Sequence, residues 1–379
     1  MTTTISGVRI LRETGFGEPS DVTFADGTIT SVAPSGARPS DGDVIDGAGK
    51  FLIPSLFDTH VHFTSEHDLE LMATRGVTTA IDLGTYPPSL VDSLRNRPGL
   101  TDIRSAGSAA SAPGSIQSTV LGFPADSVVA SPADAEGFVA KRVSEGVDLI
   151  KIIIEDPHRP GSAALSAESI AAIVAAAKSR NLTTVAHATT AFSFQLAVEA
   201  GVEIVTHAPV DRPVDDALID RMLTQGTIVS PTLVMMRRVV AAGAGPARLL
   251  LEKVDTAAPV PGPRFDVAVA TVSRLYSAGV PIIAGTDANA VGPFSLEHGE
   301  ALHDELELLT EAGLSSLEVL HSATSGAAAA LHLTDRGAIA PGLRADLVLL
   351  SADPVADIAA SRKIEAVWIA GAPVSGIEA

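Results

Sequence analysis

The feature that most constrains the fold is a unit repeated through the middle of the chain: a short β-branched strand, a polar loop and an Ala/Leu-rich helix. Eight strand segments can be counted, at 57–63, 78–84, 102–109, 149–154, 183–188, 203–208, 228–233 and 282–288. Strands that alternate with helices form parallel sheets, and eight such units predict a (β/α)8 TIM barrel of the α/β class. A doubly wound open sheet is the alternative, but no Gly-rich dinucleotide fingerprint follows the first strand.

The two ends of the chain have a different pattern, with short alternating β-type runs separated by turn residues. Asp26-Gly27 lies between two such runs and predicts a hairpin. We therefore expect a small β-sandwich-like domain built from both termini, residues 1–54 and 339–379, around a barrel of residues 55–338. A segment rich in Gly, Ala and Pro at 241–265 is interpreted as an insertion or mobile loop near the seventh helix.

Composition limits the classes of partner and site. The formal net charge of −19 disfavours nucleic acid and anionic membrane surfaces, which attract cationic proteins, and favours a small-molecule substrate. The chain has no cysteine, which excludes disulfides, thiolate metal ligands and a thiol nucleophile. It has no signal-like N-terminus and no apolar run near the roughly 18–20 residues that span a bilayer, so we expect a cytoplasmic protein. Self-association into a homo-oligomer is compatible with so apolar a barrel.

The stretch "PSLFDTHVHF" places Asp58, His60 and His62 at alternate positions at the end of an apolar run. Residues i and i+2 of a strand point to the same face, so we expect the two imidazoles and the carboxylate to project together. Such a cluster is suited to a metal ion.

Other titratable residues also fall at strand ends, where the active site of a barrel is built. Together with the first-strand pair they are His60, His62, Lys151, His187, His207 and Asp287. Each alone has a structural explanation, such as a hydrogen-bonded histidine or a helix cap, but packing does not explain the ordered set. Imidazoles and a carboxylate suit Zn²⁺, with Mn²⁺, Co²⁺ or Ni²⁺ as replacements. An ammonium is no ligand, but burial among cations would lower the pKa of Lys151, and its amine could react with CO2 to give a carbamate able to bridge two metals.

These motifs resemble the amidohydrolase superfamily, particularly its imidazolonepropionase-related and prolidase-like metal-dependent hydrolases. The resemblance covers nearly the whole chain and rests on "VIDGAGKFLIPSLFDTHVHF", "RGVTTAIDLG", "VAHA", "AGVEIVTHA", "AGTDA" and "GAIAPGLRADLVLLSADP", in that order. This chain has Ser55 where the family usually carries Gly.

The resemblance implies a binuclear metal centre. His60, His62 and Asp287 would hold the more buried ion, His187 and His207 the more exposed one, and carbamylated Lys151 and a hydroxide would bridge them. The implied reaction is cleavage of an amide or peptide-like C–N bond, as in a dipeptide or N-acyl amino acid, by the bridging hydroxide, with Asp287 moving the proton. The alternatives are hydrolysis of a lactone, carbamate or organophosphate ester at the same centre, or a non-catalytic metal-binding barrel. The last would be expected to lack a ligand such as Asp287, which is present.

Substrate preference should lie in the loops that follow the strands. The candidates are Tyr86, His158, Arg159, Arg237 and His298, each of which also has an ordinary reading as a solvated loop residue. His303, four residues before Glu307, is expected to form a pair on a helix surface.

Overall fold

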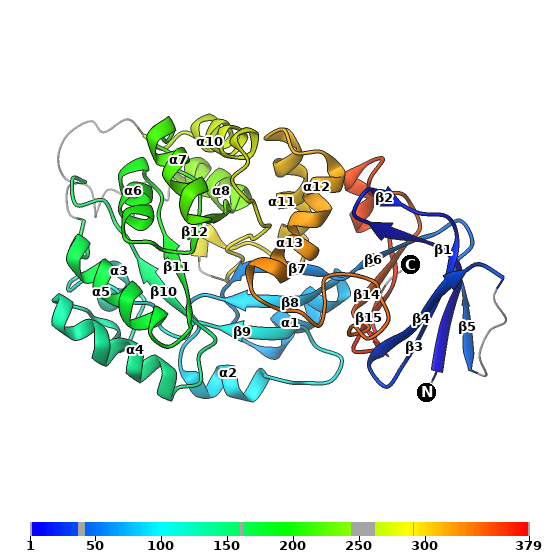
Figure 1. Ribbon diagram of the computed structural model, residues 1–379. Helices are drawn as coiled ribbons and strands as arrows, with labels where there is room; N and C mark the ends of the chain where they lie inside the picture. The colour runs from blue at the N-terminus through cyan, green and yellow to red at the C-terminus, as the bar shows by residue number, and fades with distance from the viewer. Residues whose placement is uncertain (1, 37–41, 160–161, 244–261, 291, 378–379) are drawn as a thin grey trace.

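The computed structural model describes residues 2–36, 42–159, 162–243, 262–290 and 292–377 (Figure 1). Most of the segment predicted as an insertion or mobile loop, residues 244–261, lies outside this range. Within the described residues, no helix combines the length and the apolar character needed to span a membrane.

The barrel strands are parallel and follow the predicted segments. They are β7 (Leu56–Val61), β8 (Val77–Asp82), β9 (Asp102–Ser105), β10 (Leu149–Ile153), β11 (Thr183–His187), β12 (Ile204–Thr206) and β13 (Ile228–Ser230). One sheet has the order β7-β8-β9 and another the order β10-β11-β12-β13. Every residue of β7, β8 and β10 is buried, as expected for strands covered on both faces.

Isolated bridges close these two sheets into a ring. Ala110 pairs with Ile152 between the third and fourth segments. The eighth predicted segment, 282–288, is not a regular strand, but it pairs with its neighbours on both sides through Val229↔Ile282 and Val61↔Ala288. The α/β fold class is therefore confirmed, and the eight predicted segments follow one another in a ring in which seven are regular strands and the last is held by single bridges.

Helices surround the ring (Figure 1). The longer ones are α1 (Glu66–Thr74), α2 (Pro88–Leu94), α4 (Ala135–Ser144), α5 (Ala167–Lys178), α6 (Ala191–Glu199), α7 (Asp216–Gln225), α8 (Leu233–Gly243), α10 (Phe265–Ala278), α11 (Glu300–Glu311), α12 (Ser316–Ser322) and α13 (Ser325–Ala330). Short helical turns are α3 (Ile116–Thr119), η1 (Ala125–Ser127), η2 (Pro132–Asp134), η3 (Gly292–Phe294) and η4 (Ile358–Arg362). In α5, the Ser166 side chain caps the helix by accepting the Ser169 N–H, and the helix buries Ile170 and Ile173.

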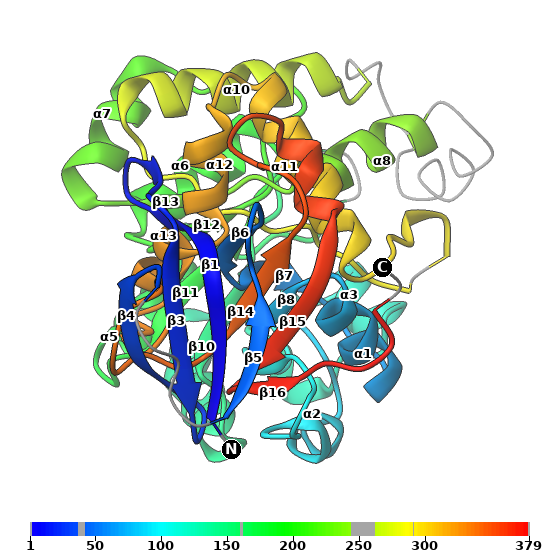
Figure 2. The same ribbon diagram turned by 90° about the vertical axis from the view of Figure 1, so that its right-hand side faces the viewer.

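Strands from both ends of the chain form one further sheet (Figure 2). They are β1 (Thr2–Arg12), β2 (Gly15–Phe16), β3 (Ser20–Ala25), β4 (Thr28–Pro34), β5 (Asp43–Asp46), β6 (Phe51–Pro54), β14 (Leu347–Leu350), β15 (Ile364–Ile369) and β16 (Ala372–Pro373). The order is β16-β15-β14-β6-β1-β3-β4, so β6 joins the C-terminal strands to the N-terminal ones. Asp26 and Gly27 both have positive φ between β3 and β4, and this confirms the predicted hairpin. The domain boundaries at 54/55 and 338/339 stay predictions.

A buried arginine ties this sheet to the barrel. Arg336 Nη1 donates to Asp102 Oδ2 at 2.8 Å and to Thr79 Oγ1 at 3.1 Å, and lies 3.8 Å from Asp346 Oδ2. Thr79 and Asp102 lie near the starts of β8 and β9, whereas Asp346 precedes β14. Arg336 and its partners therefore lie at the base of the barrel. The opposite ends of the strands are available for the site.

Candidate metal centre

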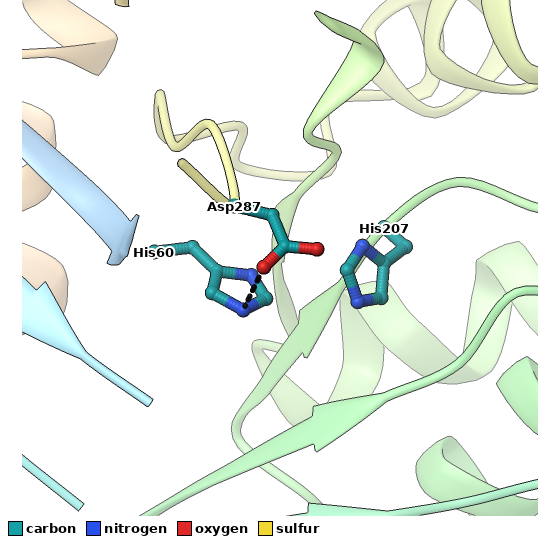
Figure 3. Close-up of side chains that lie close together, drawn as sticks. All are labelled: His60, His207 and Asp287. Carbon is teal, nitrogen blue, oxygen red and sulfur yellow. Dashed lines mark ion pairs between the residues drawn. The ribbon is translucent and has the colours of Figure 1, made fainter. Parts of the chain in front are cut away.

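Three predicted ligands meet where the first, sixth and eighth barrel segments end. His60, His207 and Asp287 each offer a ligand atom, and these atoms lie within 4.8 Å of one another (Figure 3). Asp287 Oδ1 is 3.3 Å from His60 Nε2 and 3.0 Å from His62 Nε2. The Asp287 carboxylate therefore lies between side chains of the first and sixth segments. Both imidazoles of the first segment, those of His60 and His62, are at contact distance from it.

His187 and Lys151 complete the cluster. The ring centroids of His187 and His207 are 4.5 Å apart, and those of His60 and His207 are 5.0 Å apart. Lys151 is buried, and its Nζ donates to Thr206 Oγ1 at 2.9 Å. The structure thus brings the six residues predicted from the strand ends into one neighbourhood.

Burial favours the neutral forms of three of these histidines and of the lysine. It lowers the pKa of His187 to about 3, and the nearby Lys151 adds to this effect. Burial, together with the neighbouring cationic groups, holds the pKa of both His60 and His207 well below the ordinary value. It also lowers the pKa of Lys151 to about 7, against the opposing influence of Asp287 and Asp82. Neutral imidazole is the form that binds a metal, and a neutral amine is the form that reacts with CO2.

Asp58 does not join the ligand cluster, contrary to the expectation from its alternation with the histidines. Its Oδ1 accepts the backbone N–H of Thr286 at 3.0 Å and its Oδ2 accepts the Thr286 hydroxyl at 2.7 Å. Both oxygens of the Asp58 carboxylate therefore accept hydrogen bonds from Thr286, and they fix the backbone immediately before Asp287. Burial raises the pKa of Asp58 to about 7, and the Thr286 hydrogen bonds partly offset this.

The backbone at the site adopts conformations that L residues rarely use. His207, Thr232 and Asp287 have φ of 75°, 47° and 62°, and they lie near the ends of the sixth, seventh and eighth barrel segments. Strained backbone of this kind persists where surrounding contacts enforce it, and it concentrates at functional sites. Here it turns two predicted ligands toward the centre.

Several supporting residues were not predicted from the sequence. Thr232 Oγ1 is 2.8 Å from His207 Nδ1, and Thr206 receives the Lys151 hydrogen bond. Glu305 of α11 accepts the N–H groups of Leu233 and Val234, so a buried carboxylate caps the start of α8. The threonines were adjacent to recognised motifs, but nothing in the local sequence of Glu305 indicates its burial.

The five predicted substrate residues lie in different surroundings. Tyr86 is exposed, and so is His158, whose ring meets Phe192 and whose Nδ1 is 3.0 Å from Asp156 Oδ1. Arg159 is partly buried after β10, and Arg237 is half exposed, with Nη2 3.8 Å from Asp304 Oδ2. His298 is buried, and its Nε2 lies 3.2 Å from the carbonyl oxygen of His62. His298 therefore supports the backbone of a predicted ligand. For all five residues, substrate contact stays a prediction.

The prediction for His303 is wrong. This histidine is fully buried, with Nδ1 2.8 Å from Ser361 Oγ and Nε2 3.0 Å from the carbonyl oxygen of Arg75. It joins α11 to η4 and to the end of α1, because the face of α11 that carries it packs inward.

The residues present fit a divalent cation. The cluster offers imidazole nitrogens and a carboxylate, the donor types preferred by zinc and its neighbours in the first transition series. His60 Nδ1 is buried without a hydrogen-bond partner in the part of the chain that the structure describes. Such an unpaired polar atom is costly, so it indicates that a ligand is expected there.

The fold and the site together define a (β/α)8 barrel with a histidine-rich candidate metal centre at the C-terminal ends of its strands. The chain matches the Amidohydrolase family over residues 51–374, and the protein belongs to this family. The family prediction is therefore confirmed.

Individual relatives show the same relationship. Adenine deaminase 2 of Rhizobium meliloti (strain 1021) is 28% identical over 345 residues, which are 89% of this chain and 51% of the deaminase, so the chain spans about half the length of that relative. Imidazolonepropionase of Cutibacterium acnes (strain DSM 16379 / KPA171202) is 42% identical over 79 residues, 21% of this chain and 19% of that protein. A crystal structure of a prolidase complexed with N-methylphosphonate-L-proline superposes with a TM-score of 0.82 at 25% identity and covers 99% of both chains.

Proposed function

We propose that the protein is a metal-dependent amidohydrolase that cleaves an amide or peptide-like C–N bond in a small substrate, such as a dipeptide or an N-acyl amino acid. The observation that carries the proposal is the convergence of His60, His207 and Asp287, with His62 in contact with the same carboxylate. Around them lie a buried lysine and a fourth histidine.

The proposal assigns the side chains to two divalent ions, with zinc as the preferred metal. His60, His62 and Asp287 would hold one ion and His187 and His207 the other. Lys151 would bridge them as a carbamate, formed when its neutral Nζ attacks the carbon of CO2 and releases a proton. The pKa of about 7 supports this step, because a substantial fraction of the amine is neutral near pH 7.

When bound, the ions would supply polarisation of the scissile carbonyl and acidity to a water molecule. The residues of the chain then handle the proton. Asp287, in contact with both first-strand imidazoles, would accept the proton of the attacking water as the C–O bond forms. It would return that proton to the leaving nitrogen as the C–N bond breaks, so that a carboxylic acid and an amine are released.

The similarity to a prolidase complex, which spans nearly the whole of both chains, supports an amide substrate. The match to an adenine deaminase supports hydrolysis of a C–N bond more broadly. A buried lysine facing the histidines favours the bridged centre of the prolidase-like hydrolases. Lactones, carbamates and organophosphate esters remain the alternative substrates, since the same chemistry acts on any polarised carbonyl or phosphoryl centre.

The first experiment incubates metal-loaded protein with pooled dipeptides and N-acyl amino acids and follows substrate loss by mass spectrometry, against a chelated control. The proposal expects metal-dependent loss of specific members. If the metal is bound and no member is lost, amide hydrolysis is refuted, and lactones, carbamates and phosphate esters are tested next.

The second experiment tests the bridge. We expect Lys151→Ala to lose bound metal, measured by elemental analysis, and most of its activity, with partial recovery on addition of a short-chain carboxylic acid that can take the place of the carbamate. Lys178→Ala, an exposed lysine at the end of α5, is the matched control and should behave as the wild type. Full metal content and full activity in Lys151→Ala would refute the bridged centre.

A further inference from the structure

Phe123 lies beside one of the predicted metal ligands, on the loop that follows β9. The contacts of Gly84, just after β8, define the position of Phe123. A β-carbon at position 84 would lie 2.9 Å from Cε1 and Nδ1 of His62 and 3.6 Å from Cζ of Phe123. The edge of the phenyl ring and the His62 imidazole therefore border the same small space.

This phenylalanine is not a core residue. It is only partly buried, and it packs into none of the hydrophobic clusters formed by the described residues. The same loop exposes further apolar side chains: Ile116 is 44% exposed, Val120 74% and Leu121 48%. Exposed apolar side chains on one loop, with Phe123 beside a predicted ligand, are typical of a surface that is covered by a ligand.

The base of the loop is fixed, so the position of Phe123 is defined by the barrel. Ser111 and Val128 pair across the base, with hydrogen bonds of 3.0 Å from Ser111 N to Ser127 O and 2.9 Å from Val129 N to Ser111 O. Next to this pair, the Ala110 N–H donates to the carbonyl oxygen of Lys151 at 2.8 Å. Within the loop, the Phe123 N–H donates to Gln117 O at 3.0 Å. A loop anchored in this way can present a specificity residue on a rigid scaffold.

We infer that Phe123 is a specificity-determining residue, and that it forms the wall of an apolar subsite on the His62 side of the centre. The subsite would take an aliphatic or aromatic group of the substrate. The inference rests on the proposed function, because it concerns the substrate of that same site. It narrows the substrates to those with a bulky apolar side chain next to the scissile bond.

The test measures turnover and binding separately. Turnover is followed as kcat/KM for glycyl-leucine, leucyl-glycine and glycylglycine. Binding to the metal-loaded protein is followed by calorimetry with the free amino acids leucine and glycine, which carry no amide bond and are therefore not turned over. In wild type, the leucine-containing compounds should exceed the compounds that contain only glycine by roughly 10- to 100-fold, in kcat/KM and in affinity. This is the range of discrimination available to an apolar pocket.

In Phe123→Ala this preference should fall by about 10-fold or more, while kcat/KM and affinity for the compounds that contain only glycine stay nearly unchanged. Phe123→Leu should retain most of the preference. Val120→Ser, a more exposed apolar residue of the same loop, is the matched control and should keep the preference. An unchanged preference in Phe123→Ala, an equal loss in Val120→Ser, or no leucyl preference in wild type in both turnover and binding would overturn the inference. Absent turnover with a Phe123-dependent binding preference would refute the proposed amide hydrolysis and leave the subsite standing.

Discussion

Gly285, which immediately precedes Thr286 and Asp287, allows the barrel to close beneath the site. A β-carbon there would lie 2.6 Å from Thr59 Oγ1, 3.1 Å from His60 N and even closer to Ser230 Oγ. Two of these contacts involve β7 and one involves β13. The substitution Gly285→Ala would therefore push apart three segments at the floor of the candidate metal centre.

The magnitude follows from the contacts. Overpacking of a tight core costs about 1–3 kcal/mol. The added methyl would also separate the Thr59 and Ser230 hydroxyls, now 2.9 Å apart, and an unpaired buried hydroxyl costs about 1–3 kcal/mol. Alanine restricts the unfolded chain relative to glycine, which returns about 0.4–1 kcal/mol. We expect a net loss of about 2–4 kcal/mol in the free energy of unfolding.

Urea unfolding followed by circular dichroism measures this loss. Gly137→Ala is the matched control, because Gly137 is exposed in α4 and nothing lies within 4 Å of its added β-carbon. It should stabilise the protein by about 0.5–1 kcal/mol, since alanine is the better helix former. If Gly285→Ala loses less than about 1 kcal/mol, the tight closure described for this segment is wrong.

Three further predictions concern the site and the buried histidines. Asp287→Asn keeps a residue type that tolerates positive φ, so circular dichroism should be unchanged while kcat falls by about 10²- to 10⁴-fold, and near wild-type activity would exclude Asp287 as the proton carrier. Burial lowers the pKa of His303 to about 4 from 6.5. As the pH falls, the unfolded chain therefore takes up a proton at this histidine before the folded chain does. The stability present above pH 6.5 is lost as the pH falls toward 4. In His303→Gln the free energy of unfolding should decline less steeply between pH 6.5 and 4, and equal slopes would contradict this. Removal of metal by a chelator should lower both activity and the thermal midpoint, and zinc should restore both, because a ligand that binds only the folded state stabilises it. An unaltered midpoint after verified metal removal would argue against a centre built from these side chains.

The residue pattern alone predicted the order of the elements and the neighbourhood of the site. Eight apolar segments alternating with helices have few arrangements that bury both faces of a parallel sheet, and a residue at the end of each segment must then lie at the same rim. For this reason the sequence alone predicts one group made of His60, His62, Lys151, His187, His207 and Asp287. The partial exception was the last segment, 282–288, whose backbone is held by single bridges.

Only the tertiary structure decided which side chains support the centre and which surround it. Asp58 alternates with two histidines, yet it binds Thr286, 228 residues away. His303 and His298 belong to polar stretches, yet they are buried by packing against η4 and the first barrel loop. In the sequence, nothing distinguishes Phe123 from other loop residues. In the structure, it lies beside His62, as the contacts of Gly84 show. Local pattern carries the period of a strand or helix, whereas these contacts depend on how the ring closes between residues far apart in the chain.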